Sequence, residues 1–147
     1  GRYTLDKQLT EAMIPMLNAV GIRAKLATPE WATLWANVQK GTVPFYYMGR
    51  GSVQDPSAAL HQYFHTGETP RIGYSNPKVD ELLDKEQQEF DAKKRRQYLS
   101  QAMSLITEDA PACFMWRHKL LWGLHSRVDY KPLPDSRVYA IEMAVKK

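Results

Sequence analysis

The sequence contains a single cysteine, Cys113, among its 147 residues. One cysteine cannot form a disulfide within the chain, and it cannot supply a CxxC metal or redox motif. The residues around it, Ala112, Phe114 and Met115, are apolar, which predicts a free thiol packed in the protein core.

Long hydrophobic runs are also missing. No stretch approaches the roughly 18 apolar residues that a membrane-spanning helix requires. No signal peptide opens the chain, and its first residues, Gly1–Tyr3, do not resemble a natural protein start. We therefore expect a fragment of a longer protein.

Neither sign of charge is in large excess. The 20 basic and 16 acidic residues are scattered and give a net charge of +4, so we expect no nucleic-acid partner. The dense basic run Lys93–Arg96 is expected on the solvated face of a helix. With 44% hydrophobic residues, the chain is about one domain long and is expected to be soluble and globular.

What the sequence does contain is a glycine-punctuated stretch at Phe45–Pro56, reading FYYMGRGSVQDP. An apolar run that stops at Gly49 and leads to Asp55 is typical of a buried strand, a polar loop and the start of a helix. Arg50 brings several hydrogen-bond donors to this loop, and glycine lets a ligand approach the backbone closely. The pattern predicts a binding loop, although a purely structural connection between a strand and a helix uses the same residues.

Capping residues and helical spacing predict five helices. Each helix follows a residue whose side chain can accept a hydrogen bond from the first turn, and the expected caps are Asp6, Thr28, Asp55, Asn76 and Asp91. Apolar residues recur at helical spacing after each cap. The last two helices are expected to form a helical hairpin.

Short apolar runs between and after the helices predict strands. They lie at Ile22–Thr28, Phe45–Met48, Ala112–Trp116, Leu120–Leu124 and Val138–Ala144. The second run lacks alternating polar residues, which is typical of a parallel strand covered by helices on both faces. The expected fold is therefore α/β, with a mixed sheet flanked by helices.

Histidine and cysteine leave an enzyme as an alternative. His61 and His65 are four residues apart, so a helix places both on one face, as zinc ligands require. Cys113 paired with a histidine would be a candidate nucleophile. The sequence fixes neither a third zinc ligand nor a base beside the cysteine, and a metal- or cysteine-dependent hydrolase stays the alternative to a binding protein.

Two tryptophans have the spacing of a helix face. Trp31 and Trp35 are four residues apart, which is typical of core residues. Trp31, however, falls in the first turn of its helix, near the rim where open α/β sheets bind ligands. An aromatic wall facing Arg50 would suit a ligand with an apolar body and an anionic or carbonyl group.

Six phrases of the sequence, taken in order, resemble the C-terminal half of one known family. They are GRYTLDKQLTEAM…LNAVGI, EWATLW…VQKG, GRGSVQDP, GYSNPKVDELLDK, KRRQYLSQAMSLITEDAP and KLLWGLHSRVDYKPLPDSRV. The family is that of the family 5 extracellular solute-binding proteins, the dipeptide- and oligopeptide-binding receptors of bacterial ABC importers. The resemblance extends over nearly the whole chain.

This resemblance implies part of a two-lobed periplasmic receptor that closes on a small or peptide-like solute and delivers it to the permease subunits of an ABC transporter. No catalysis, cofactor or metal is implied. Residues 1–111 would belong to the C-terminal lobe, which here lacks its first strand. Residues 112–147 would cross back towards the missing N-terminal lobe. The open sheet edge would let the fragment self-associate.

The resemblance also implies where the solute binds. A tryptophan that lines peptide sites in some members corresponds to Trp31, and the family's glycine-rich loop follows the second strand. The ligand-binding residues implied in this way are Trp31, Gly49, Arg50, Gly51 and Ser52.

The loop departs from the family pattern at two positions. The family loop typically reads Gly-Trp-x-x-Asp, and its aspartate pairs with a peptide's terminal amine. Here Arg50 replaces the tryptophan, and Val53 stands near the aspartate position. An arginine repels an ammonium group that has lost its carboxylate partner, so the departure favours an anionic or carbonyl-rich solute. The alternative is that Arg50 points outward to the other lobe.

Overall fold

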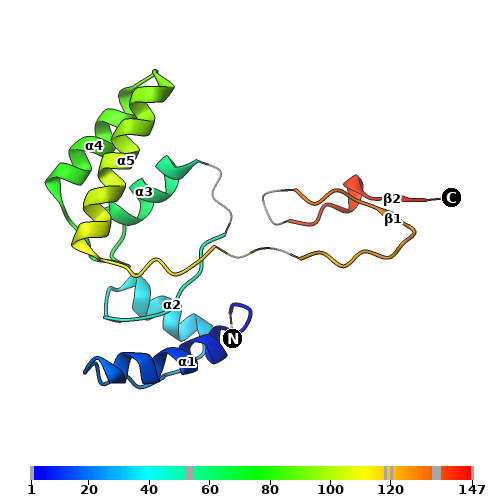
Figure 1. The fold of residues 1–147 in the computed structure, drawn as a ribbon, viewed down its shortest axis with the longest axis horizontal. Coiled ribbons are helices and arrows are strands. Elements are labelled where there is room, and N and C mark those ends of the chain that lie inside the picture. Colours follow the sequence, from blue (N-terminus) through cyan, green and yellow to red (C-terminus); the bar gives the residue numbers. More distant parts are fainter. Residues whose placement is uncertain (1, 52–54, 118, 120, 134–136, 147) are drawn as a thin grey trace.

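Helices make up most of the regular structure in this chain, and one short antiparallel pair of strands follows them (Figure 1). The computed structural model describes residues 2–51, 55–117, 119, 121–133 and 137–146. Over these residues the protein is a mixed α/β protein that is mostly helical, and none of its helices is both long and apolar enough to span a bilayer. In chain order, the elements are α1 (Asp6–Ala19), α2 (Trp31–Gln39), α3 (Pro56–Phe64), α4 (Pro77–Gln88), α5 (Ala92–Asp109), β1 (Val128–Asp129), a 3₁₀ helix (Ala140–Glu142) and β2 (Ala144–Val145).

Three helices begin where the sequence predicts them. The side chains of Asp55, Asn76 and Asp91 accept hydrogen bonds from backbone N–H groups in the first turns of α3, α4 and α5. A proline follows the cap in α3 and α4, where its missing N–H costs no hydrogen bond within the helix. These three predicted caps are confirmed.

The first two helices begin differently. α2 begins at Trp31, and the carboxylate of Glu30 accepts hydrogen bonds from two N–H groups of the first turn, at 2.8 and 3.3 Å. The cap predicted at Thr28 is therefore wrong, because the glutamate side chain satisfies these donors instead. Asp6 is the first residue of α1 rather than its cap, and its carboxylate accepts from the backbone N–H of Tyr3 at 2.9 Å.

The core lies where α3 packs against the α4–α5 pair (Figure 1). α4 and α5 lie side by side, so the predicted helical hairpin is confirmed. The stripe of apolar residues along each of the three helices faces the other two. The buried side chains of this core are Leu60, Phe64, Val79, Leu83, Ala102 and Ile106.

One carboxylate, that of Glu86 on α4, is buried within the same three helices. Its side chain is 0% exposed, and it accepts hydrogen bonds from the guanidinium group of Arg95 on α5 and from Ser57 Oγ on α3, the latter at 2.7 Å. His61 Nε2 lies 3.8 Å from Glu86 Oε2. A buried charge persists only when it is paired and hydrogen-bonded, so this network fixes α3 against the hairpin.

Most of the predicted strands are not formed in the described residues. Ile22–Thr28 and Phe45–Met48 are irregular, and so are Ala112–Trp116 and the described part of Leu120–Leu124. A strand needs a neighbour that takes up its backbone hydrogen bonds, and Phe45 is 69% exposed with no sheet beside it in the described chain. The α/β class is therefore confirmed only in its coarser form, as a mixed and mostly helical protein, and the mixed sheet flanked by helices is not formed in the described residues.

A small hairpin forms near the end of the chain instead. β1 and β2 pair in antiparallel register, with Val128 opposite Val145. The strand predicted at Val138–Ala144 is wrong in position, because most of that range is irregular or 3₁₀-helical. Tyr130 is buried next to this hairpin, and its ring lies 6.3 Å from that of Trp122.

Between α5 and the hairpin, the chain leaves the helices as an extended segment (Figure 1). We define the extended segment as the described residues of 112–124. Its large apolar side chains are poorly covered, with Phe114 51% and Leu121 93% exposed. Cys113 is also exposed, so the predicted core thiol is wrong. The predicted division of the chain at residue 111 falls just before this segment and stays a prediction.

Candidate functional site

Gly49 and Tyr3 are in close contact, although they are far apart in the sequence. The Tyr3 hydroxyl donates a hydrogen bond to the Gly49 carbonyl oxygen at 2.9 Å. A Cβ atom at position 49 would lie 3.1 Å from Cε1 of the Tyr3 ring, closer than ordinary van der Waals contact. Glycine therefore lets the ring lie directly against the loop backbone. Burial raises the pKa of Tyr3, so the hydroxyl stays protonated and able to donate at neutral pH.

Tyr3 is the centre of a set of rings that we call the aromatic face, made of Tyr3, Trp31, Trp35, Tyr47 and Trp116. Tyr3 makes edge contacts with Trp31 and Tyr47, and the ring centroids are 6.2 Å apart in both pairs. Trp31 stacks on Trp35 at 5.6 Å, and Tyr47 lies 6.2 Å from Trp116. The face thus joins the N-terminal turn, α2, the loop before α3 and the extended segment.

Two arginines, Arg50 and Arg71, meet beside this face, and we call them the arginine pair. Their Nη1 atoms donate to the same acceptor, the hydroxyl oxygen of Tyr63, at 3.0 and 3.3 Å respectively. The Arg71 guanidinium carbon lies 4.5 Å from the Trp35 ring centroid, and that of Arg50 lies 5.0 Å from the Tyr63 centroid. Cation–π contacts of this kind hold the guanidinium groups against the rings.

Neutral groups hold the arginine pair in place. The side-chain oxygen of Gln62 accepts from Arg50, and that of Gln39 accepts from Arg71 Nε at 2.8 Å. The Tyr46 hydroxyl donates to the Arg71 backbone carbonyl at 2.9 Å, and burial raises the pKa of this tyrosine. Among the described residues, no salt bridge involves either arginine. No carboxylate in this part of the chain therefore neutralises the pair.

The predicted ligand-binding residues fall at different places in this arrangement. Trp31 and Gly49 both contact Tyr3, and Arg50 belongs to the arginine pair. Gly51 has open space around it, because a Cβ atom there would meet nothing within 4 Å. Ser52 lies outside the described residues. Solute binding by all five residues stays a prediction.

Sequence reasoning did not single out Tyr3, Tyr63 or Arg71 as site residues. Arg71 lies in the connection between α3 and α4, and no cap or periodic pattern links it to Arg50. The available signal was Tyr63, whose ring packs against the core while its hydroxyl reaches the arginines. A tyrosine packed against a core usually finds a partner for its polar end, and for the partly buried Tyr63 that partner is a pair of cations.

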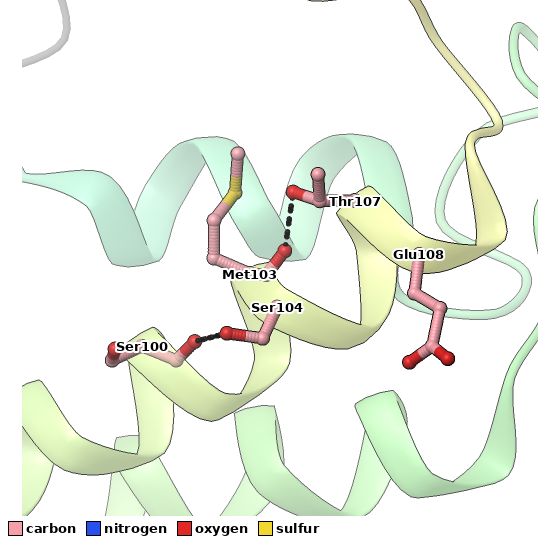
Figure 2. Close-up of a pocket in the computed structure, with 5 residues that line it drawn as sticks. All are labelled: Ser100, Met103, Ser104, Thr107 and Glu108. Atoms are coloured by element: carbon pink, nitrogen blue, oxygen red, sulfur yellow. Dashed lines mark hydrogen bonds between the residues drawn. The ribbon is translucent and has the colours of Figure 1, made fainter.

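Two hollows in the described surface are not ligand cavities, because one is too small and the other is too open. A hollow of about 60 Å³ beside Tyr3 and Trp31 has room for roughly two water molecules. A larger, open depression of about 570 Å³ lies on α5, where the hydroxyls of Ser104 and Thr107 donate to backbone carbonyls of their own helix (Figure 2). The depression is open and shallow, and two of its polar side chains are already bonded to their own helix.

The two histidines of the enzyme alternative have structural partners. The rings of His61 and His65 stack with centroids 5.6 Å apart. His61 Nε2 lies 3.2 Å from the Leu83 carbonyl, and His65 Nε2 lies 3.3 Å from Asp84 Oδ1. Within the described ranges, no group of three histidine, cysteine, aspartate or glutamate side chains is placed to hold a metal ion. The zinc-hydrolase alternative therefore gains no support from this geometry.

His65 also has a shifted pKa. Burial lowers its pKa, but the hydrogen bond with the Thr66 carbonyl and the negative charges of Asp80 and Asp84 outweigh that effect, so the net shift is upward. The proton therefore binds more readily in the folded state, and this imidazole strengthens the contact between α3 and α4 most below its unfolded pKa. That contribution is lost as the pH rises through the folded pKa.

The comparisons with known proteins leave the family undecided. No protein-family model matches the chain, and the search of curated proteins gives no match either. The features of this chain that bear on its function are therefore the six sequence phrases, the aromatic face and the arginine pair.

Proposed function

We propose that this chain is part of the solute-binding receptor of an ABC importer that works outside the cytoplasm, in the periplasm. The receptor captures a small or peptide-like solute by closing two lobes around it, and it then delivers the solute to the permease subunits. Two-lobed receptors act by shifting a population from open to closed states, and no covalent step is involved.

The observation that carries this proposal is the aromatic face with the arginine pair at its edge. Half-buried rings next to hydrogen-bond donors are typical of ligand sites. The hollow beside Trp31, at about 60 Å³, is far smaller than the roughly 300 Å³ or more that a ligand pocket needs. A second surface placed over the face would complete such a pocket, as a second lobe does in a receptor that closes on its ligand.

The extended segment is an independent reason to propose a second lobe. Proteins rarely leave a contiguous run of large apolar side chains in water. Phe114, Met115 and Trp116 are 51%, 40% and 45% exposed, and Leu121 is almost completely exposed. A lobe packed against these side chains would remove them from water. This is the role that the family resemblance assigns to the N-terminal lobe.

The test uses the longer protein that contains both lobes, purified without a ligand-stripping step. Mass spectrometry of solutes released on denaturation should identify a bound small molecule, and calorimetry should then show one solute per receptor. The 147-residue chain should bind the same solute much more weakly, because it supplies only one side of the cleft. No captured solute from cells that import peptides and related compounds, or full-strength binding by the isolated chain, would contradict the proposal.

The hydrolase alternative makes different predictions for the same sample. A zinc enzyme would contain stoichiometric zinc, and a cysteine enzyme would lose turnover when Cys113 is alkylated. We expect the receptor to retain solute binding after alkylation, since Cys113 is exposed on the extended segment and takes no part in the described hydrogen bonds of the arginine pair. Metal analysis and alkylation followed by calorimetry separate the two functions.

A further inference from the structure

The arginine pair is an unusual arrangement because two like charges meet at one neutral oxygen. Arg50 and Arg71 both donate to the Tyr63 hydroxyl, and no described carboxylate forms an ion pair with either. Two like charges held this close to one atom repel each other, and the repulsion is stronger near a protein surface than in bulk water. An anion bound beside the two arginines would reduce this repulsion, so the arrangement favours binding of an anion.

The surroundings hold the two guanidinium groups in position without neutralising them. Arg71 is fixed between the Trp35 ring and the Gln39 side-chain oxygen. Arg50 is fixed by Gln62 and by the Tyr63 ring. Amide oxygens and aromatic faces orient a cation but leave its net charge intact. The positive charge is therefore preorganised.

Some hydrogen-bond donors of the arginine pair and of Tyr63 have no acceptor among the described residues. The described hydrogen bonds engage Nη1 of both arginines and Nε of Arg71, and Nη2 of each arginine has no partner among the described residues. The Tyr63 oxygen accepts two hydrogen bonds, while its own hydrogen has no acceptor within the described chain. Two guanidinium edges and one phenolic hydrogen thus remain available to a guest.

We propose that Arg50, Arg71 and Tyr63 form a binding site for an oxyanion group, a carboxylate or a phosphate, on the solute. The inference rests on the proposed function for the assumption that the guest is a captured solute. Arginine forks match both kinds of oxyanion, because each presents paired oxygen atoms to two parallel N–H donors. The adjacent aromatic face takes an apolar body attached to that group.

The test titrates the 147-residue chain with three probes that share one ring: phenylacetate, phenyl phosphate and the neutral phenylacetamide. Binding is followed by NMR, using the side-chain N–H signals of Trp35 and Arg71, which detect millimolar affinities. We expect at least one of the two anions to bind about tenfold or more tightly than phenylacetamide. The tighter of the two anions identifies which oxyanion the site takes.

Matched variants connect this preference to the site. Arg71→Gln and Arg50→Gln each remove one charge, and Tyr63→Phe removes only the hydroxyl, so each should reduce the preference for the anion severalfold. Arg2→Gln is the control, because Arg2 also lies over a tryptophan, 5.1 Å from the Trp31 centroid, but takes no part in the described hydrogen bonds of Arg50 and Arg71. Unchanged backbone signals from Leu83 and Ala102 would show that each variant retains its core.

Failure of this inference is distinguishable from failure of the receptor function. Equal binding of charged and neutral probes, absence of binding by both anions, or an anion preference that survives Arg50→Gln combined with Arg71→Gln would overturn the oxyanion site. A neutral solute released from the two-lobed protein would also overturn it while leaving the receptor function intact. Absence of any captured solute would contradict the receptor function, whatever the probes show.

Discussion

The contact between Tyr3 and Gly49 shows how one missing side chain shapes the candidate site. The Tyr3 ring lies against the backbone at position 49, and its hydroxyl donates to the carbonyl there. The same ring makes edge contacts with Trp31 and Tyr47. Any displacement of Tyr3 therefore disturbs the aromatic face on both sides.

Replacing Gly49 with alanine should displace this ring. The new Cβ atom would lie 3.1 Å from Tyr3 Cε1, so the ring must move by a few tenths of an ångström and its hydrogen bond to position 49 weakens. We expect a loss of about 1 kcal/mol in stability, at the low end of overpacking effects. Urea unfolding measures the loss, and NMR shifts of Trp31 report the moved ring.

Gly51→Ala is the matched control for that substitution. A Cβ atom at position 51 meets nothing within 4 Å, so this variant should leave the Trp31 signal unchanged. Equal effects of the two variants would mean that alanine acts through loop flexibility rather than through contact with Tyr3.

The sequence singled out some residues of the candidate site but not their neighbours. Trp31, Gly49 and Arg50 were identified from local patterns and from the family resemblance, and all three lie at or beside the aromatic face. Arg71 and Tyr63 were not identified as site residues, because the contact between them arises from tertiary packing of α3 against the following loop. No spacing rule contains that information.

At the scale of elements, helices were predictable and strands were not. A helix satisfies its hydrogen bonds within one segment, and caps such as Asp55, Asn76 and Asp91 mark its start locally. A strand takes its hydrogen bonds from another segment. Phe45–Met48 has the composition of a buried strand but has no neighbouring strand within the described chain, so it is irregular.

The three core helices should depend strongly on Glu86. Its buried carboxylate links α4 to Arg95 on α5 and to Ser57 on α3. Glu86→Ala leaves a cavity, and the arginine and hydroxyl lose their acceptor. Breaking a buried ion pair in this way typically costs about 3–5 kcal/mol. Urea unfolding followed by circular dichroism measures the change.

Glu81→Ala provides the control, since Glu81 lies on the same helix and pairs with Lys85 on the exposed surface. Solvent screens this second pair, so its removal should change stability much less. Similar losses in the two variants would contradict the role assigned to the buried network.

At the scale of the whole molecule, the helical core and the extended segment are covered to very different degrees. Side chains such as Leu83 and Ile106 are fully buried between helices, whereas Leu121 is 93% exposed. Self-association through the open edge of a larger sheet is predicted from the sequence, but that sheet is not formed in the described residues. The extended segment, with its exposed apolar side chains, is the surface through which we expect association instead.

The 147-residue chain should therefore associate in a concentration-dependent way through the extended segment. Phe114→Asp combined with Leu121→Asp puts charge on this segment and should shift the sedimentation profile towards monomer. Phe90→Asp is the control, because Phe90 is 99% exposed but lies in the connection between α4 and α5.

Joining the chain to its proposed second lobe should suppress association in the same way as the double substitution, since the lobe would cover the same side chains. A chain that stays monomeric at all concentrations, or that responds equally to Phe90→Asp, would show that the extended segment is not the associating surface.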